Sequence, residues 1–126
     1  MNLNTMASNK FQSALQRLSS EPLAIAASFR IKKIMRKVAE ELKDFDESKQ
    51  ILITNYSVKN EDGTPKVLDN GSVTLDPTSE SEWKPQLTKL LEIEVELPKL
   101  KASELGEIKL SAQDLASLEE IIEEDL

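Results

Sequence analysis

The chain has 126 residues, a formal net charge of −7 at pH 7, and neither Cys nor His. This length suits one domain with its own core. The missing Cys excludes disulfides and Cys-based zinc sites, and the missing His removes the commonest general base and metal ligand. The three glycines are too scattered for a phosphate-binding loop. We therefore expect a protein that is not an enzyme and that uses no metal or other cofactor.

Two helices are predicted in the first part of the chain. Ser8 can cap a short helix over residues 9–18. A second helix begins near Pro22, and no Gly or Pro interrupts it before about Tyr56. Apolar residues follow it at alternating spacings of four and three. A helix of about 30 residues is about 45 Å long, more than the first helix can cover. We therefore expect part of the stripe to form an oligomer seam. The seam residues are Ile31, Met35, Val38, Leu42 and Phe45.

Turn and strand patterns follow the long helix. Asn70-Gly71 between residues 66–68 and 72–75 predicts a tight β-hairpin, because both residues tolerate a positive φ. Ser79 is positioned to cap a third helix that carries Trp83 in its core-facing register. Residues 92–97 alternate strictly between Glu and apolar residues, which predicts a half-buried third strand with its glutamates in water.

The last part of the chain predicts a short extended piece around residues 108–110 and a final helix that starts with the capping pattern Ser111-x-x-Asp114. The apolar residues of this helix are Leu115, Leu118, Ile121 and Ile122. The expected fold class is α+β. An N-terminal helical hairpin with one long amphipathic helix would be joined by a small antiparallel three-stranded sheet and by short helices at the C-terminal end. We expect a single domain over residues 1–126, made of a helical hairpin (1–57), a β-hairpin, helix and third strand (58–110), and an acidic C-terminal helix (111–126).

Four stretches carry a resemblance to known proteins. They are residues 23–42 with Ile34-Met35-Arg36-Lys37, residues 59–63 followed by Asp69-Asn70-Gly71, residues 90–97, and residues 110–119. In this order they resemble a group of small tailed-bacteriophage proteins of unassigned function. The resemblance implies a phage origin and a role in virion assembly or in manipulating the host. It brings no catalytic residues. Because no signal peptide or apolar span is visible, we expect the cytoplasm of the infected cell as the location.

Charge is distributed unevenly along the chain. Residues 1–39 hold seven basic residues and one acidic residue, a net of +6, and residues 40–126 hold nine basic and twenty-two acidic residues, a net of −13, which together give −7. Five basic residues lie within positions 30–37 of the long helix. We predict an anion-binding site, suited to the phosphates of a nucleotide messenger or a short nucleic acid, at one face of this cluster. Its residues are Arg30, Lys33, Arg36 and Lys37.

Two plainer interpretations of the cluster remain open. The basic residues can form ordinary surface pairs with carboxylates four positions on, as in Arg36 with Glu40, Lys37 with Glu41 and Lys43 with Glu47. Alternatively, the acidic C-terminal helix can lie across the basic stretch of its own chain. The carboxylates of that helix are Glu119, Glu120, Glu123, Glu124 and Asp125.

Three classes of function fit these features. The favoured one is a non-enzymatic phage accessory protein that sequesters or blocks a host factor or an anionic nucleotide-type signal, in the manner of a counter-defence protein. The alternative is a virion structural or assembly protein in which the opposed charges favour head-to-tail contacts. A metal-dependent enzyme built only from carboxylates is disfavoured. We expect a homo-oligomer, with a host protein or a small anionic ligand as partner, and neither double-stranded nucleic acid nor a membrane.

Overall fold

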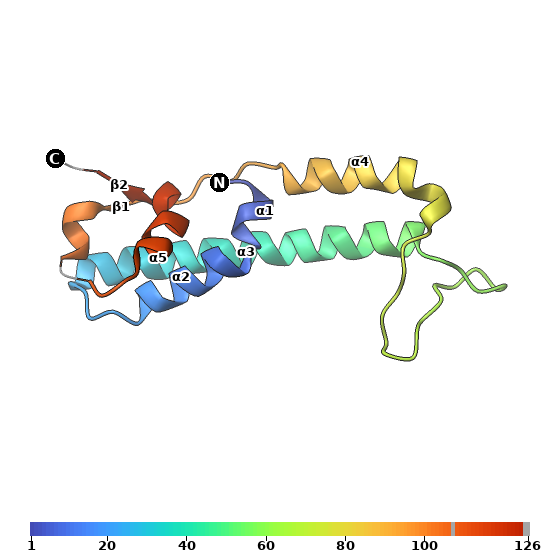
Figure 1. Cartoon of the computed structure of the whole chain (residues 1–126), viewed down its shortest axis with the longest axis horizontal. Helices are drawn as coiled ribbons and strands as arrows, with labels where there is room; N and C mark the ends of the chain where they lie inside the picture. Colours follow the sequence, from blue (N-terminus) through green and yellow to red (C-terminus); the bar gives the residue numbers. More distant parts are fainter. Residues whose placement is uncertain (107, 125–126) are drawn as a thin grey trace. The chain divides into compact units, whose positions relative to one another are not determined.

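The computed structural model describes residues 1–106 and 108–124 (Figure 1). The chain forms two compact units. The terminal unit comprises residues 1–42 and 94–126, and the central unit comprises residues 43–93. Both helix and strand are present, which confirms the mixed α and β content. Among the described residues, no helix combines the length and the apolar character needed to cross a membrane.

Helices dominate both units. The terminal unit contains α1 (Leu3–Met6), α2 (Asn9–Ser19), the first part of α3 (Ile25–Tyr56), β1 (Leu100–Lys101), η2 (Ala102–Leu105), α5 (Ala112–Ser117), η3 (Glu119–Ile121) and β2 (Ile122–Glu123). The central unit contains the second part of α3, η1 (Pro77–Ser79) and α4 (Glu80–Leu91). The long helix α3 has 32 residues, as its uninterrupted pattern predicts. It begins at Ile25, three residues after the expected start at Pro22.

The core of the terminal unit is built from aliphatic residues and one Phe. Ser8 caps α2 as predicted, since its hydroxyl oxygen accepts a hydrogen bond from the Phe11 amide at 3.3 Å. The buried face of α2 follows the helical period. It consists of Phe11, Ala14, Leu15 and Leu18. Ala27, Ile31, Ile34 and Val38 of α3 are also buried. Leu100, Leu118 and Ile121 add fully covered side chains from the C-terminal part of the chain.

The predicted antiparallel three-stranded sheet is wrong. The sheet has two short strands, β1 and β2, which pair in parallel with Leu100 opposite Ile122. Residues 92–97 form no strand, although the glutamates in this stretch are exposed as expected. Their backbone contacts are made with the N-terminal residues instead: the Val95 amide donates to the Met1 carbonyl at 2.8 Å, and Asn2 bridges Glu94. Alternation predicts an extended, half-buried segment, but the choice of pairing partner depends on distant residues.

The Asn70-Gly71 turn forms in the central unit, but it is too short to build a sheet. Gly71 has a φ of +82°, and Val67 bridges Val73 across the turn. Two further single bridges join Lys59 to Pro65 and Ser57 to Leu75. The Val58 amide donates a hydrogen bond to the Thr74 carbonyl, and the Val58 carbonyl accepts one from the Lys66 amide. Residues 57–75 therefore form two small loops, one closed by the Lys59–Pro65 bridge and the other by the Val67–Val73 bridge. Figure 1 shows both loops projecting beyond the end of α3.

The start of α4 differs from the predicted cap. At α4, Ser79 makes no side-chain capping bond. Asp76 caps the preceding η1 turn instead, accepting from the Thr78 amide at 2.9 Å. Trp83 of α4 is half-buried and donates from Nε1 to the Asp76 carbonyl at 3.0 Å. Figure 1 shows α4 running back along the end of α3, and the Gln86 amide donates to the Tyr56 hydroxyl at 3.1 Å.

The final helix is shorter than predicted. Ser111 caps α5 through a hydrogen bond from the Asp114 amide at 3.1 Å. The helix ends at Ser117, and Ile121 and Ile122 belong to η3 and β2. Pairing of β2 with β1 satisfies this backbone and avoids placing glutamates at a helix C-terminus, where the helix dipole disfavours them. Residues 108–110, predicted to be extended, form no regular element, and Asp125 of the expected acidic helix lies outside the described residues.

Candidate functional site

The basic cluster lies on the first half of α3, in the terminal unit. The helix is continuous through the cluster, so the backbone fixes the direction of each side chain. Lys33, Arg36 and Lys37, three of the four predicted residues, line one open groove of about 530 Å³. Glu40, one turn further along α3, completes the helical side of the groove. We call this feature the basic groove.

The opposite side of the basic groove comes from the segment that precedes β1. Glu96, Leu97 and Pro98 line it. Leu97 and Pro98 give the groove an apolar surface, whereas Glu96 adds a second carboxylate beside that of Glu40. With three basic and two acidic residues, the groove carries a formal charge of +1 in a chain of net charge −7. Sequence reasoning missed this side, because it placed residues 92–97 in a sheet with the hairpin and not beside the long helix.

Arg30, the fourth predicted residue, does not belong to the groove. Its guanidinium forms an ion pair with Glu104 of η2. The Glu104 carboxylate also accepts a hydrogen bond from the Lys101 amide at 3.1 Å, so it serves as a cap for η2. Arg30 therefore ties α3 to η2, a structural role.

The three basic residues of the groove differ in what holds them. Lys37 pairs with Glu41 at 3.2 Å, the one of the three predicted i, i+4 pairs that forms among the described residues. The Lys33 ammonium lies 4.8 Å from the centre of the Phe29 ring, a cation–π contact. Arg36 is exposed, and within the described part of the chain its guanidinium has no ion pair. Arg36 is thus the cation that a ligand can engage without displacing an existing partner.

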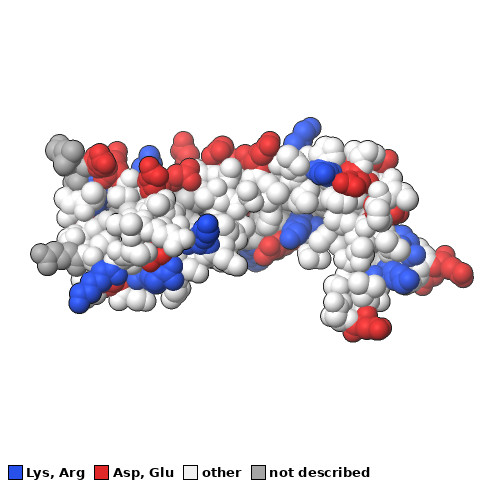
Figure 2. Space-filling view, in the orientation of Figure 1, with Lys and Arg blue, Asp and Glu red and all other residues white. Residues whose placement is uncertain are grey.

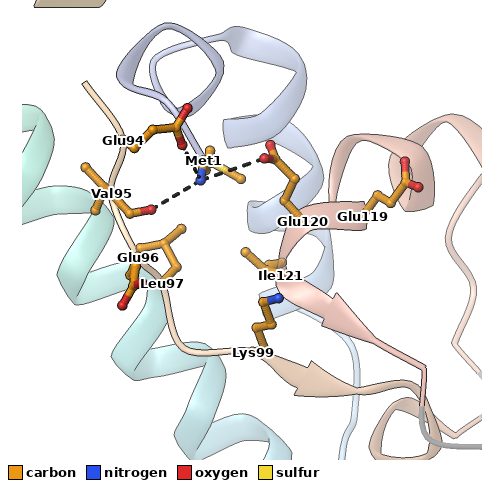
Figure 3. A pocket seen from close by; sticks show the side chains of 9 residues that line it. All are labelled: Met1, Glu94, Val95, Glu96, Leu97, Lys99, Glu119, Glu120 and Ile121. Atoms are coloured by element: carbon orange, nitrogen blue, oxygen red, sulfur yellow. Dashed lines mark hydrogen bonds and ion pairs between the residues drawn. The ribbon is translucent and has the colours of Figure 1, made fainter. Parts of the chain in front are cut away.

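Of the carboxylates predicted to lie across the basic cluster, the described Glu119 and Glu120 lie at a different site. Glu119 and Glu120 line a separate pocket of about 660 Å³ with Met1 and Glu94, shown in Figure 3. The Met1 amino group donates to the Val95 carbonyl at 3.2 Å and pairs with Glu94 at 3.2 Å and Glu120 at 3.7 Å. In Figure 3 these two carboxylates point toward the amino group, whereas Glu119 points away. This pocket is therefore occupied by the chain's own cation.

Glu96 and Leu97 line both the acidic pocket and the basic groove. The segment that they belong to is therefore a thin wall between two sites of opposite charge. Figure 2 shows the same separation on a larger scale within the terminal unit: acidic side chains gather along the edge near β2, and basic ones along the edge near α2. The described residues include no cluster of carboxylates suited to a metal ion.

A third site joins α2 to α5. The Arg17 guanidinium binds the Asp114 carboxylate with two bonds, from Nε to Oδ2 at 2.6 Å and from Nη2 to Oδ1 at 2.5 Å. The two hydrogen bonds from Arg17 are the main cause that holds the pKa of Asp114 below its usual value, and hydrogen bonds with Ser111 add a smaller effect. The same bonds to Asp114 raise the pKa of Arg17. Asp114 is 8% exposed, so the pair fastens the final helix to α2. Sequence reasoning treated Asp114 only as part of a helix start.

The predicted oligomer seam is largely covered by the chain itself. Ile31, Val38 and Phe45 are 3%, 6% and 7% exposed, and Met35 and Leu42 are half-buried. Their helical stripe is core, as amphipathic stripes usually are. A homo-oligomer remains a prediction, but it would need residues other than these.

Comparison of the chain with protein-family models, curated proteins and solved structures finds no match.

Proposed function

We propose that the chain is a non-enzymatic binding protein that holds a phosphate-bearing ligand of the nucleotide type in the basic groove. The observation that carries this proposal is the convergence of Lys33, Arg36 and Lys37 on one groove beside apolar Leu97 and Pro98. A volume of about 530 Å³ falls within the range of small-molecule sites.

Each part of the groove has a matching part in such a ligand. The Arg36 guanidinium can donate two parallel hydrogen bonds to a phosphate, and the two lysines supply further charge. The i, i+4 pair of Lys37 with Glu41 is only partly buried, so water screens it and its rearrangement costs little. Leu97 and Pro98 offer contact to a flat base, and the carboxylates of Glu40 and Glu96 can accept hydrogen bonds from hydroxyl or amino groups. A purely anionic ligand such as sulfate would use only the basic part.

The resemblance to tailed-phage proteins supplies the context of the proposal. A phage protein with this groove would act by sequestering a nucleotide-type signal of the host, and so blunt a defence that depends on it. Binding alone suffices for this task, which agrees with the absence of His and Cys from the sequence.

The proposal is tested by thermal melting of the full chain with pyrophosphate, ATP and a cyclic dinucleotide. A ligand that binds only the folded state raises the melting temperature, with about 2.7 kcal/mol of added stability at a hundred times its Kd. We expect a rise that is abolished by Arg36→Gln with Lys37→Gln. The matched control is Lys43→Gln with Lys49→Gln, two exposed lysines of the same helix outside the groove.

Two results would overturn the proposal. One is a melting temperature that none of the three ligands changes. The other is a rise that the groove variant and the control variant lose equally, because the effect would then come from general charge and not from the groove.

A further inference from the structure

The exposed face of α3 next to the basic groove has an unusual composition. Ile25, Phe29, Lys32 and Arg36 follow at i, i+4, i+7 and i+11, which places them on one stripe of the helix. Ile25 is 88% exposed and Phe29 is 57% exposed, and both cations are exposed as well. We call these four residues the outer stripe. They are distinct from the predicted seam, whose residues lie on the buried side.

Leaving Ile25 and Phe29 in water forgoes the stabilisation that burial of large apolar side chains provides. Neighbouring exposed apolar residues flanked by charges are typical of contact surfaces, and aromatic residues and Arg dominate the binding energy of such surfaces. The cations Lys32 and Arg36 require that whatever covers the stripe be acidic.

The chain itself presents a surface with these properties. Four exposed glutamates lie in η3, in β2 and directly after β2 in the terminal unit, and the half-buried Ile122 lies among them. The glutamates are Glu119, Glu120, Glu123 and Glu124. Only Glu120 has an ion pair within the described part of the chain, with the Met1 amino group. We call this surface the acidic end.

We propose that the outer stripe of one copy binds the acidic end of a second copy. The charges are complementary, and Phe29 and Ile25 of one copy would gain apolar contact with Ile122 of the other. The two surfaces consist of different residues, so the contact is heterologous and joins copies head to tail. It needs neither the predicted seam nor a ligand in the basic groove.

The contact is an open-surface one whose charges remain near water, so we expect it to be weak and sensitive to salt. The test is sedimentation velocity of the full chain across about a hundredfold range of protein concentration, at low and at high salt. The expected result is an average mass that grows with concentration at low salt and falls toward that of the monomer at high salt.

Charge-swap variants identify the surfaces. Lys32→Glu with Arg36→Glu, and separately Glu123→Lys with Glu124→Lys, should each give a monomer because like charges would meet. A mixture of the two variants should associate again, since each supplies the surface that the other has lost. Lys43→Glu with Lys49→Glu, outside both surfaces, should associate like the natural sequence.

Ile25→Ser separates this proposal from the basic groove. Ile25 is 88% exposed and does not line the groove. The variant removes apolar contact and leaves the groove residues and the Phe29 ring beside Lys33 in place, so it should weaken association while the ligand-induced rise in melting temperature persists. The proposal is overturned if the natural sequence stays monomeric at every concentration, or if the mixed charge-swap variants do not associate. Capture of an acidic partner other than a second copy, with the chain itself monomeric, also overturns it.

Discussion

Arg17 and Asp114 show how one pair of side chains determines the position of the C-terminal part of the chain. The two hydrogen bonds between them span 97 positions of sequence and connect α2 with α5. Burial of the Asp114 carboxylate opposes its charge, but the hydrogen bonds and the positive charge of the Arg17 guanidinium, together with the hydrogen bonds from Ser111, outweigh this cost and lower the pKa of Asp114.

The Arg17–Asp114 pair makes the folding stability of the chain depend on pH in the acidic range. The pKa of Asp114 is lowered in the folded state, so its contribution is fully present above the unfolded pKa near 4 and is lost as the pH falls through the lower folded value. Asp114→Asn should therefore lower the melting temperature at neutral pH and reduce the further loss as the pH falls below about 4. Thermal melting as a function of pH measures both effects.

The matched control is Asp69→Asn. Asp69 is an exposed carboxylate for which the described part of the chain shows no ion pair. It should leave the melting curve unchanged at neutral pH. An Asp114→Asn variant as stable as the natural sequence, with the same decline in acid, would show that the pair contributes nothing.

At the scale of elements, α3 is both core and surface. Each side carries an isoleucine, so the effect of the same substitution can be compared on the buried and on the exposed side of one helix. Ile34 is fully buried, whereas Ile25 is 88% exposed. Ile34→Ala should cost about 2–5 kcal/mol of unfolding free energy through lost burial and a cavity. Ile25→Ala, in dilute protein, should stay within about 0.5 kcal/mol. Urea unfolding measures the difference, and equal effects would contradict the assignment of the core.

The helices could be predicted from sequence because their signals are local. Ser8 caps α2, and α3 runs uninterrupted to Tyr56, since capping and the apolar period depend on residues a few positions apart. Strand pairing depends on distant residues. The alternating segment around Val95 meets the N-terminal residues, and Leu100 pairs with Ile122, which no local pattern indicates.

The same distinction applies to the candidate site. Lys33, Arg36 and Lys37 were predictable as a group, because helical spacing alone brings them together. That Arg30 lies outside this group could not be predicted, because its ion-pair partner Glu104 lies 74 positions away in the sequence. Glu96, Leu97 and Pro98 escaped prediction for the same reason: they reach the groove through the path of a loop.

At the scale of the whole molecule, the net charge of −7 opposes the approach of an anion, whereas the groove attracts it. Screening decides between the two effects. At physiological ionic strength the Debye length is about 8 Å, so distant carboxylates contribute little and the neighbouring cations dominate. Glu40 and Glu96 are near enough to matter, which favours ligands that also offer hydrogen-bond donors over simple anions.

Nucleotide binding in the basic groove is tested residue by residue by a nuclear magnetic resonance titration of the full chain with ATP, followed through its backbone amides. We predict that the largest shift changes fall on residues 33–40 and on Glu96 and Leu97, and that Arg36→Gln suppresses them. Shift changes centred on the acidic pocket around Met1, or on the Arg17–Asp114 pair, would contradict the claim, as would a spectrum that the nucleotide leaves unchanged.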